Sequence, residues 1–130
     1  GLGDVYKRQR ATRPEDRQDI FVMIWWPDYA DPSSWFQSMV HSEESPAFNL
    51  GYIKNAEWDA KIEEAMQLTA TDRASAEALY KEVQMGVLDG AHMIPVYDQV
   101  ITYAVSTEID GFYYNPAYPN STLYFSITHK

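Results

Sequence analysis

The sequence contains no cysteine. This absence excludes a disulfide framework, a zinc site built on thiolates and a catalytic thiol nucleophile. It also leaves the redox compartment of the protein open. The fold must rest on apolar packing instead, and hydrophobic residues make up 45% of the 130 positions. That content is enough for the core of one ordinary domain.

Basic residues are scarce. The chain has 10 Lys and Arg against 19 Asp and Glu, which gives a formal net charge of −9. Nucleic-acid-binding surfaces need clustered basic side chains, so no nucleic-acid partner is expected. An acidic body favours cationic ligands through its field, but it does not identify one. Half of the basic residues lie near the start of the chain, at Lys7, Arg8, Arg10, Arg13 and Arg17.

No apolar stretch approaches the length that crosses a membrane, and no signal peptide opens the chain. We therefore expect contact with a membrane only through a transporter or an anchor outside this sequence. Residues 1–9, GLGDVYKRQ, fit nothing downstream and resemble the translated adapter sequence found at the ends of environmental sequence fragments. We exclude them from fold reasoning as foreign. On this interpretation the natural N-terminus is missing, and the lack of a signal peptide says nothing about location.

The apolar patterns predict an α/β or α+β layer structure, with a mixture of strands and amphipathic helices. Residues 10–17 are polar and are expected to be exposed. The predicted elements are, in order, a buried strand at 18–24, helices at 32–40, 55–69 and 71–89, one or two strands over 93–105 and a last strand at 123–127.

The predicted helices have recognisable ends and apolar faces. Asn55 is expected to cap the second helix, Thr71 or Asp72 the third, and Gly90 to end it. The residues expected to face a core are Trp35, Phe36, Met39 and Val40, then Trp58, Ile62, Ala65 and Met66, then Ala76, Leu79, Tyr80, Val83 and Val87.

The most informative stretch is the turn at 25–32, with the sequence WWPDYADP. Pro27 and Pro32 prevent a helix between them, so the predicted strand ends in a fixed turn that carries two indoles, a phenol and two carboxylates. Aromatic walls with a few placed polar groups are typical of ligand pockets. The same residues also suit a core and an ordinary turn, because Trp and Tyr are often buried and Asp beside Pro forms turns. Both interpretations stay open on these residues alone.

The sequence supports an enzymatic function less well than a binding function. Asp28 and Asp31 are candidates for a glycosidase-like acid and base flanked by sugar-binding indoles, although both also have local roles in a turn. No serine lies in a Gly-x-Ser-x-Gly motif. His41, His92 and His129 are scattered without metal-ligand spacing, so no metal site is expected. A Tyr-rich tail acting as an interaction surface is the remaining alternative.

Five motifs, in this order and spacing, resemble the family 5 extracytoplasmic solute-binding proteins of ABC importers. They cover the chain from Asp19 to about Lys130. The motifs are DIFV at 19–22 followed by WWPDYADP at 25–32, FN at 48–49 with Tyr52 and NAEWD at 55–59, ALYKEVQ at 78–84, MIPVY at 93–97, and IDGF at 109–112.

The resemblance implies a fragment of a two-lobed, class II periplasmic-binding-protein-like α/β fold, a mixed sheet with flanking helices. Residues 10–100 would belong to the distal ligand-binding lobe, and 101–130 to the return through the hinge and a tail on the base lobe. It implies a periplasmic or extracytoplasmic receptor rather than an enzyme. Such a receptor has no cofactor and has two partners, a small-molecule or peptide ligand and an ABC permease.

By position in the motif, the resemblance implies that Asp28 holds the α-ammonium of a peptide ligand. A carboxylate suits this task, because a buried ammonium needs a charge-assisted partner. The other ligand-binding residues implied are Trp25 and Trp26 as walls, Pro27 and Tyr29 through their backbone, Asn49, Tyr97 and Gln99. Asp31 is expected to cap the following helix. Asn49 is also a candidate for bracing its loop.

One departure from the family pattern bears on the ligand. Trp26 and Pro27 stand where peptide receptors often have small residues. A second indole shrinks the pocket or offers a stacking platform. A short peptide, an opine, an amine or a sugar therefore fits better than a long peptide, and a carbohydrate receptor of the same family remains an alternative.

Overall fold

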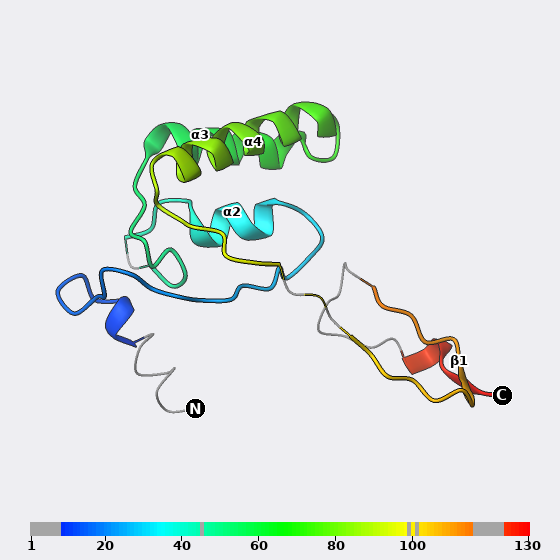
Figure 1. Cartoon of the computed structure of the whole chain (residues 1–130). Coiled ribbons are helices and arrows are strands. Elements are labelled where there is room, and N and C mark those ends of the chain that lie inside the picture. The colour runs from blue at the N-terminus through cyan, green and yellow to red at the C-terminus, as the bar shows by residue number, and fades with distance from the viewer. Residues whose placement is uncertain (1–8, 45, 99, 101, 116–123) are drawn as a thin grey trace.

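The computed structural model describes residues 9–44, 46–98, 100, 102–115 and 124–130. Figure 1 shows a helical part, in cyan and green, and a C-terminal part, in orange and red, that extends away from it. A short helical turn at residues 9–11 precedes the regular elements. These elements are α2 (Ser33–Met39), α3 (Ala56–Leu68), α4 (Arg73–Asp89), β1 (Ile109–Asp110), a 3-10 turn η1 (Tyr124–Ser126) and β2 (Thr128–His129).

Helices α3 and α4 form a hairpin, and both begin where the sequence predicts. The Asn55 side chain accepts hydrogen bonds from the amides of Glu57 and Trp58 at 3.0 and 3.2 Å. The Asp72 carboxylate accepts one from the Ser75 amide at 3.1 Å. These caps satisfy donors that have no partner inside a helix. The predicted N-caps are therefore confirmed.

The core lies between the two helices of this hairpin and the chain that precedes them. Most of the predicted apolar positions are in it, but Met66 on α3 is exposed, so that one assignment was wrong. Gly86 on α4 lies directly under the Trp58 ring, where an added Cβ would come within 2.7 Å of the indole. The buried core residues are Val40, Ile53, Ile62, Ala65, Ala76, Tyr80, Val83 and Val87.

Helix α2 packs beneath this hairpin, as Figure 1 shows. The N-cap of α2 is Pro32, one residue after the predicted cap Asp31. The Asp31 carboxylate nevertheless accepts a hydrogen bond from the Ser33 amide at 2.9 Å, at the start of the helix. Phe36 stacks on Tyr80 of α4 with ring centroids 4.9 Å apart. Trp35 remains exposed, so the predicted apolar face of this helix is only partly covered.

The strands predicted at 18–24 and 93–105 are not formed in the described residues. Both segments run without regular secondary structure, and their large apolar side chains are mostly exposed. The prediction of a buried strand at 18–24 was therefore wrong. A strand exists only through its pairing, and the structure describes no neighbouring strand with which these residues pair. Residues 10–17 also differ from expectation at Ala11, which is buried and accepts a hydrogen bond from the Tyr52 hydroxyl.

The described sheet is a single antiparallel pair, β1 with β2, in which Ile109 faces His129 and Asp110 faces Thr128. Gly111 follows β1 with φ +74°, a left-handed conformation in which a Cβ would overlap the Ser126 carbonyl. The strand predicted at 123–127 is instead a 3-10 turn at Tyr124–Ser126, while Leu123 lies outside the described residues. The described residues therefore form a mixture of helix and strand, and the predicted mixed sheet flanked by helices is not present among them. None of the described helices has the length and apolar character needed to cross a bilayer.

Candidate functional site

The turn at 25–32 is pinned to the first turn of α2. The Asp28 amide donates a hydrogen bond to the Ser34 hydroxyl at 2.9 Å. The Tyr29 hydroxyl lies 3.1 Å from the Ser33 hydroxyl, and the Asp31 amide donates to the Tyr29 carbonyl at 2.9 Å. Ser33 and Ser34 are both buried, so a rigid element holds this turn in place.

The Asp28 side chain is exposed, and in the described part of the chain its carboxylate makes no hydrogen bond or ion pair. Its backbone is fixed by Ser34 while its charge remains unengaged. Asp31 differs, because its carboxylate is already used at the start of α2. The two carboxylates of the turn therefore differ in their hydrogen bonding, and Asp28 is the one that remains available to bind a cation.

The two indoles of the turn are half-buried. Trp25 packs edge-on against Phe48, with ring centroids 4.2 Å apart. Its indole nitrogen is buried and has no hydrogen-bond partner among the described residues. Burying an unpaired donor is costly, so this N–H is a position where an acceptor from a ligand or a water would be stabilising.

Beside the turn lies an open groove with a volume of about 600 Å³. Pro27 and Tyr29 of the predicted site line it, but Asp28 does not. Among the described residues, Asp31 and Asp98 are the charged ones that line it, so this part of the groove is apolar with an acidic rim. The remaining lining residues are Ala30, Pro32, Trp35, Phe36, Met39, Val40, Gln84, Val87, Leu88, Met93 and Pro95.

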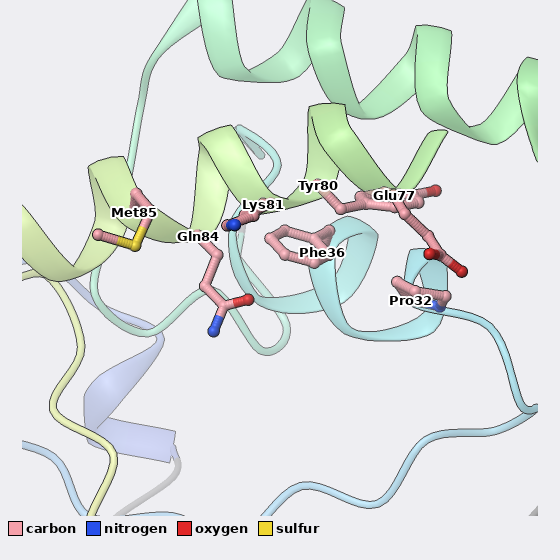
Figure 2. A pocket seen from close by; sticks show the side chains of 7 residues that line it. All are labelled: Pro32, Phe36, Glu77, Tyr80, Lys81, Gln84 and Met85. Atoms are coloured by element: carbon pink, nitrogen blue, oxygen red, sulfur yellow. The ribbon is translucent and has the colours of Figure 1, made fainter. Parts of the chain in front are cut away.

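A smaller hollow of about 390 Å³ shares Pro32, Phe36 and Gln84 with this groove. Figure 2 shows Phe36 beside Tyr80, with Gln84 and Met85 further along α4. Both charges at this hollow, Glu77 and Lys81, come from the exposed side of α4. We assign no ligand to it.

Asn49 is 2% exposed and does not face the groove. Its amide nitrogen donates to the carbonyls of His41 and Ile53 at 3.1 and 2.8 Å. Its amide oxygen accepts from the Ile53 amide at 2.9 Å. These bonds are those of a residue that braces its loop, which is the alternative role given to it from the sequence.

The last two predicted residues lie on the chain after α4. Tyr97 is exposed and does not line the groove, whereas its neighbours Pro95 and Asp98 do. Gln99 lies outside the described residues. Sequence reasoning missed the part that α2 and the end of α4 play in the groove. The sequence did contain one signal of this contribution, which is Trp35. It is a large aromatic residue on a short helix, and the other apolar residues of that helix are enough to pack it against the core.

His41 links the loop before α3 to that helix. Its ring nitrogens lie 3.1 Å from the Glu63 carboxylate and 3.1 Å from the Ser42 carbonyl, and Asp59 is 4.0 Å away. Burial lowers the pKa of His41, but the hydrogen bonds to Glu63 and Ser42 and the two carboxylate charges outweigh it and raise the pKa above 6.5. The described residues contain no group of three or more His, Asp or Glu suited to a metal ion.

Three curated relatives match most of the chain. The probable D,D-dipeptide-binding periplasmic protein DdpA of Escherichia coli (strain K12) is 29% identical over 88% of this chain and 22% of its own length. The probable deoxycholate-binding periplasmic protein YgiS of the same strain is 31% identical over 68% of this chain and 16% of its own. Heme-binding protein A of Haemophilus influenzae is 30% identical over 84% of this chain and 19% of its own.

These matches confirm the resemblance drawn from the motifs: the chain is a relative of the family 5 periplasmic solute-binding proteins. It spans about a fifth of the length of the curated relatives it matches. Two of the three relatives described are named as periplasmic, in agreement with the location expected from the sequence. No protein-family model matches the chain, and no solved structure matches it.

Proposed function

We propose that this chain is part of the substrate-binding component of an ABC importer. The protein would capture a peptide or a related small amine-bearing solute outside the cytoplasm and deliver it to a membrane permease. The observation that carries the proposal is the match to binding proteins over most of the chain. The names of these relatives specify a D,D-dipeptide, deoxycholate and heme as the bound solutes.

The turn at 25–32 supports a solute with an ammonium group. Asp28 offers an unengaged carboxylate on a backbone that Ser34 holds in place. The adjacent groove has apolar walls and two carboxylates, Asp31 and Asp98, and none of the Lys or Arg residues in the described part of the chain lines it. Asp28 does not line the groove, but it lies between Pro27 and Tyr29, which do. A charge-assisted hydrogen bond from a solute ammonium to Asp28 beside the groove would fix the orientation of the solute, while the apolar walls bury the rest.

We also propose the division of the chain between two lobes, with 10–100 in the distal lobe and 101–130 in the return to the base lobe. The separation of β1 and β2 from the helices in Figure 1 supports this division. A hinge between lobes that close on a solute would run through the chain between α4 and β1.

A carbohydrate ligand is the second candidate, and the two half-buried indoles favour it. Sugar rings stack well on Trp faces, and the Trp25 indole has an N–H that needs an acceptor. The glycosidase interpretation has weaker support. The Asp31 carboxylate already accepts a hydrogen bond from the Ser33 amide, and the relatives are binding proteins.

Isothermal titration calorimetry on the natural polypeptide that carries this chain tests the proposal. The panel contains dipeptides, oligopeptides, amines and oligosaccharides, and each binding solute is incubated with the protein and analysed for products. We expect micromolar or tighter binding of at least one amine-bearing solute without turnover. Turnover of any panel member would contradict the proposal of a binding component, and binding of oligosaccharides alone would contradict the amine assignment.

A further inference from the structure

The hydroxyl of Tyr80 on α4 is buried and has no hydrogen-bond partner among the described residues. Tyr80 is 4% exposed, and its ring stacks on Phe36 of α2 with centroids 4.9 Å apart. Figure 2 shows the two rings lying together. A ring held in this way does not turn its hydroxyl out to solvent. Because a buried unpaired hydroxyl costs stability, its presence in the core requires an explanation.

Two other hydroxyls lie near that of Tyr80. Burial raises the pKa of Tyr80, and the hydroxyls of Thr69 and Ser33 act against this rise. Both of these hydroxyls are engaged elsewhere. The Thr69 hydroxyl donates to the Ala65 carbonyl at 3.0 Å, and the Ser33 hydroxyl lies 3.1 Å from that of Tyr29. The Tyr80 hydroxyl therefore has two potential partners nearby and a hydrogen bond to neither.

The bonds made by Thr69 and Ser33 differ in what a solute can reach. Thr69 is bonded to the carbonyl of Ala65 in its own helix, and Ala65 is buried. Ser33 is bonded to Tyr29, which is 47% exposed and lines the groove beside the turn. A phenol in this position can donate a hydrogen bond to an acceptor on a bound solute. Such a solute takes Tyr29 away from Ser33 and frees the Ser33 hydroxyl for another partner.

We propose that Ser33 exchanges its hydrogen-bond partner when a solute binds. The Tyr29 hydroxyl then donates to an acceptor on the solute, and the Ser33 hydroxyl pairs with that of Tyr80. Tyr80 touches no solute and acts through Ser33, so it is a positioning residue. This inference rests on the proposed solute-binding function. It adds a second group that the groove recognises beside an ammonium, which is a hydrogen-bond acceptor such as a carbonyl oxygen.

The exchange gives a solute with an acceptor an advantage in affinity. Ser33 is 5% exposed, so losing Tyr29 without a replacement would leave a second buried hydroxyl unpaired. With the exchange, the new bond to Tyr80 removes an unpaired group that is present before binding. One hydrogen bond gained in this way corresponds to about a tenfold gain in affinity. A solute without an acceptor leaves the bond between Ser33 and Tyr29 intact and gains nothing from Tyr80.

Calorimetry on the natural polypeptide with two probes tests the exchange. Phenylalaninamide and 2-phenylethylamine both carry an ammonium and a phenyl ring, and only the first has a carboxamide. We expect the wild-type to bind the amide about tenfold or more tightly than the amine. Tyr29→Phe should bring this ratio close to one, and Tyr80→Phe should lower it at least about threefold. The control Tyr113→Phe removes a hydroxyl from a tyrosine that is 50% exposed outside the groove, and it should leave the ratio as in the wild-type.

Ser33→Ala separates the exchange from a direct effect of Tyr80. This variant removes the hydroxyl that changes partner, so the ratio should fall and should no longer depend on Tyr80. Combining Ser33→Ala with Tyr80→Phe should therefore lower the ratio no further than Ser33→Ala alone. Without solute, Tyr80→Phe removes only an unpaired group, so we expect its urea denaturation midpoint to equal or exceed that of the wild-type.

Several results would overturn the exchange. Equal affinity of the wild-type for the two probes would show that no acceptor is recognised. A ratio that Tyr80→Phe leaves unchanged, with a lowered denaturation midpoint, would show that Tyr80 already has a structural partner such as a buried water. Either result leaves the amine assignment intact, because both probes bind. Failure of both probes to bind would overturn the amine assignment together with this inference.

Discussion

Asn49 shows how a single buried amide can organise a loop in this chain. It bonds to the carbonyls of His41 and Ile53 and to the Ile53 amide, so it closes the loop that leads into α3. All three of these backbone groups are hydrogen-bonded to the same side chain, which is 2% exposed. The residue type agrees with the family motif, but the geometry supports a role in holding the protein together.

Replacing Asn49 by Ala should therefore destabilise the fold. The change leaves buried polar groups of Ile53 without partners, and we expect the free energy of unfolding to fall by about 2–3 kcal/mol. Urea denaturation followed by helical circular dichroism measures it, with the exposed Gln67→Ala on α3 as the control. A loss below about 0.5 kcal/mol would show that the loop does not need the brace.

His41 predicts a pH dependence of stability. Burial lowers the pKa of His41, but the hydrogen bonds to Glu63 and Ser42 and the charges of Asp59 and Glu63 together outweigh burial and raise the pKa in the folded state. A raised pKa means that the folded state favours the protonated ring. The stabilisation is thus complete below the ordinary value of 6.5 and is lost as the pH rises through the higher folded-state pKa.

Denaturation midpoints measured from pH 5 to pH 9 test this dependence in the wild-type and in His41→Gln. We expect the stability difference between them to shrink as the pH rises from 6.5. His92 and His129 are present in both proteins, so their contributions cancel in this difference. Parallel profiles across the range would show that His41 does not link protonation to folding.

At the scale of elements, the sequence predicted correctly those segments whose hydrogen bonds are formed between residues close together in the chain. Asn55 and Asp72 cap their helices as predicted, because a cap needs only side chains and amides within three residues. The apolar stripes of α3 and α4 were predicted almost completely, because the two helices bury each other. Met66 was the exception, since periodicity alone does not give the width of the covered face.

Strand predictions failed for the opposite reason. The patterns at 18–24 and 93–105 describe side chains that suit a sheet, but a sheet requires a partner at a distance along the sequence. The candidate site was predictable only in its local part. The turn at 25–32 could be predicted because Pro27 and Pro32 prevent a helix there, whereas the contribution of α2 and α4 to the groove depends on tertiary packing.

The contact between α3 and α4 predicts the effect of one glycine. Gly86→Ala would bring a Cβ within 2.7 Å of the Trp58 ring and force the helices apart. We expect a net destabilisation of about 1–2 kcal/mol, after the gain in helix propensity is subtracted.

Gly51→Ala is the matched control, because its added Cβ meets ordinary contacts at 3.6 Å or more. We expect this change to alter the free energy of unfolding by less than about 0.5 kcal/mol. Both values come from urea denaturation. A neutral Gly86→Ala would mean that Trp58 moves aside without cost.

At the scale of the whole molecule, the chain exposes more apolar surface than a self-contained domain usually does. Large apolar side chains are exposed in 20–24, in 93–97 and in the C-terminal part. Large exposed apolar side chains gathered in a few segments are typical of surfaces that a partner covers. We expect the isolated chain to bind a hydrophobic fluorescent dye and to melt over a broad range of temperature. A sharp, cooperative melt with no dye binding would contradict this account of the surface.

The central claim is that the turn at 25–32 holds the cationic group of a solute through Asp28. The most direct test compares Asp28→Asn with Glu64→Gln in the natural polypeptide, by calorimetry with an amine-bearing solute that the wild-type binds. Each variant removes one negative charge, and Glu64 lies exposed on α3 away from the turn. We expect Asp28→Asn to weaken binding by about 2–5 kcal/mol and Glu64→Gln to leave it unchanged. Equal affinity of the wild-type and Asp28→Asn would contradict the claim.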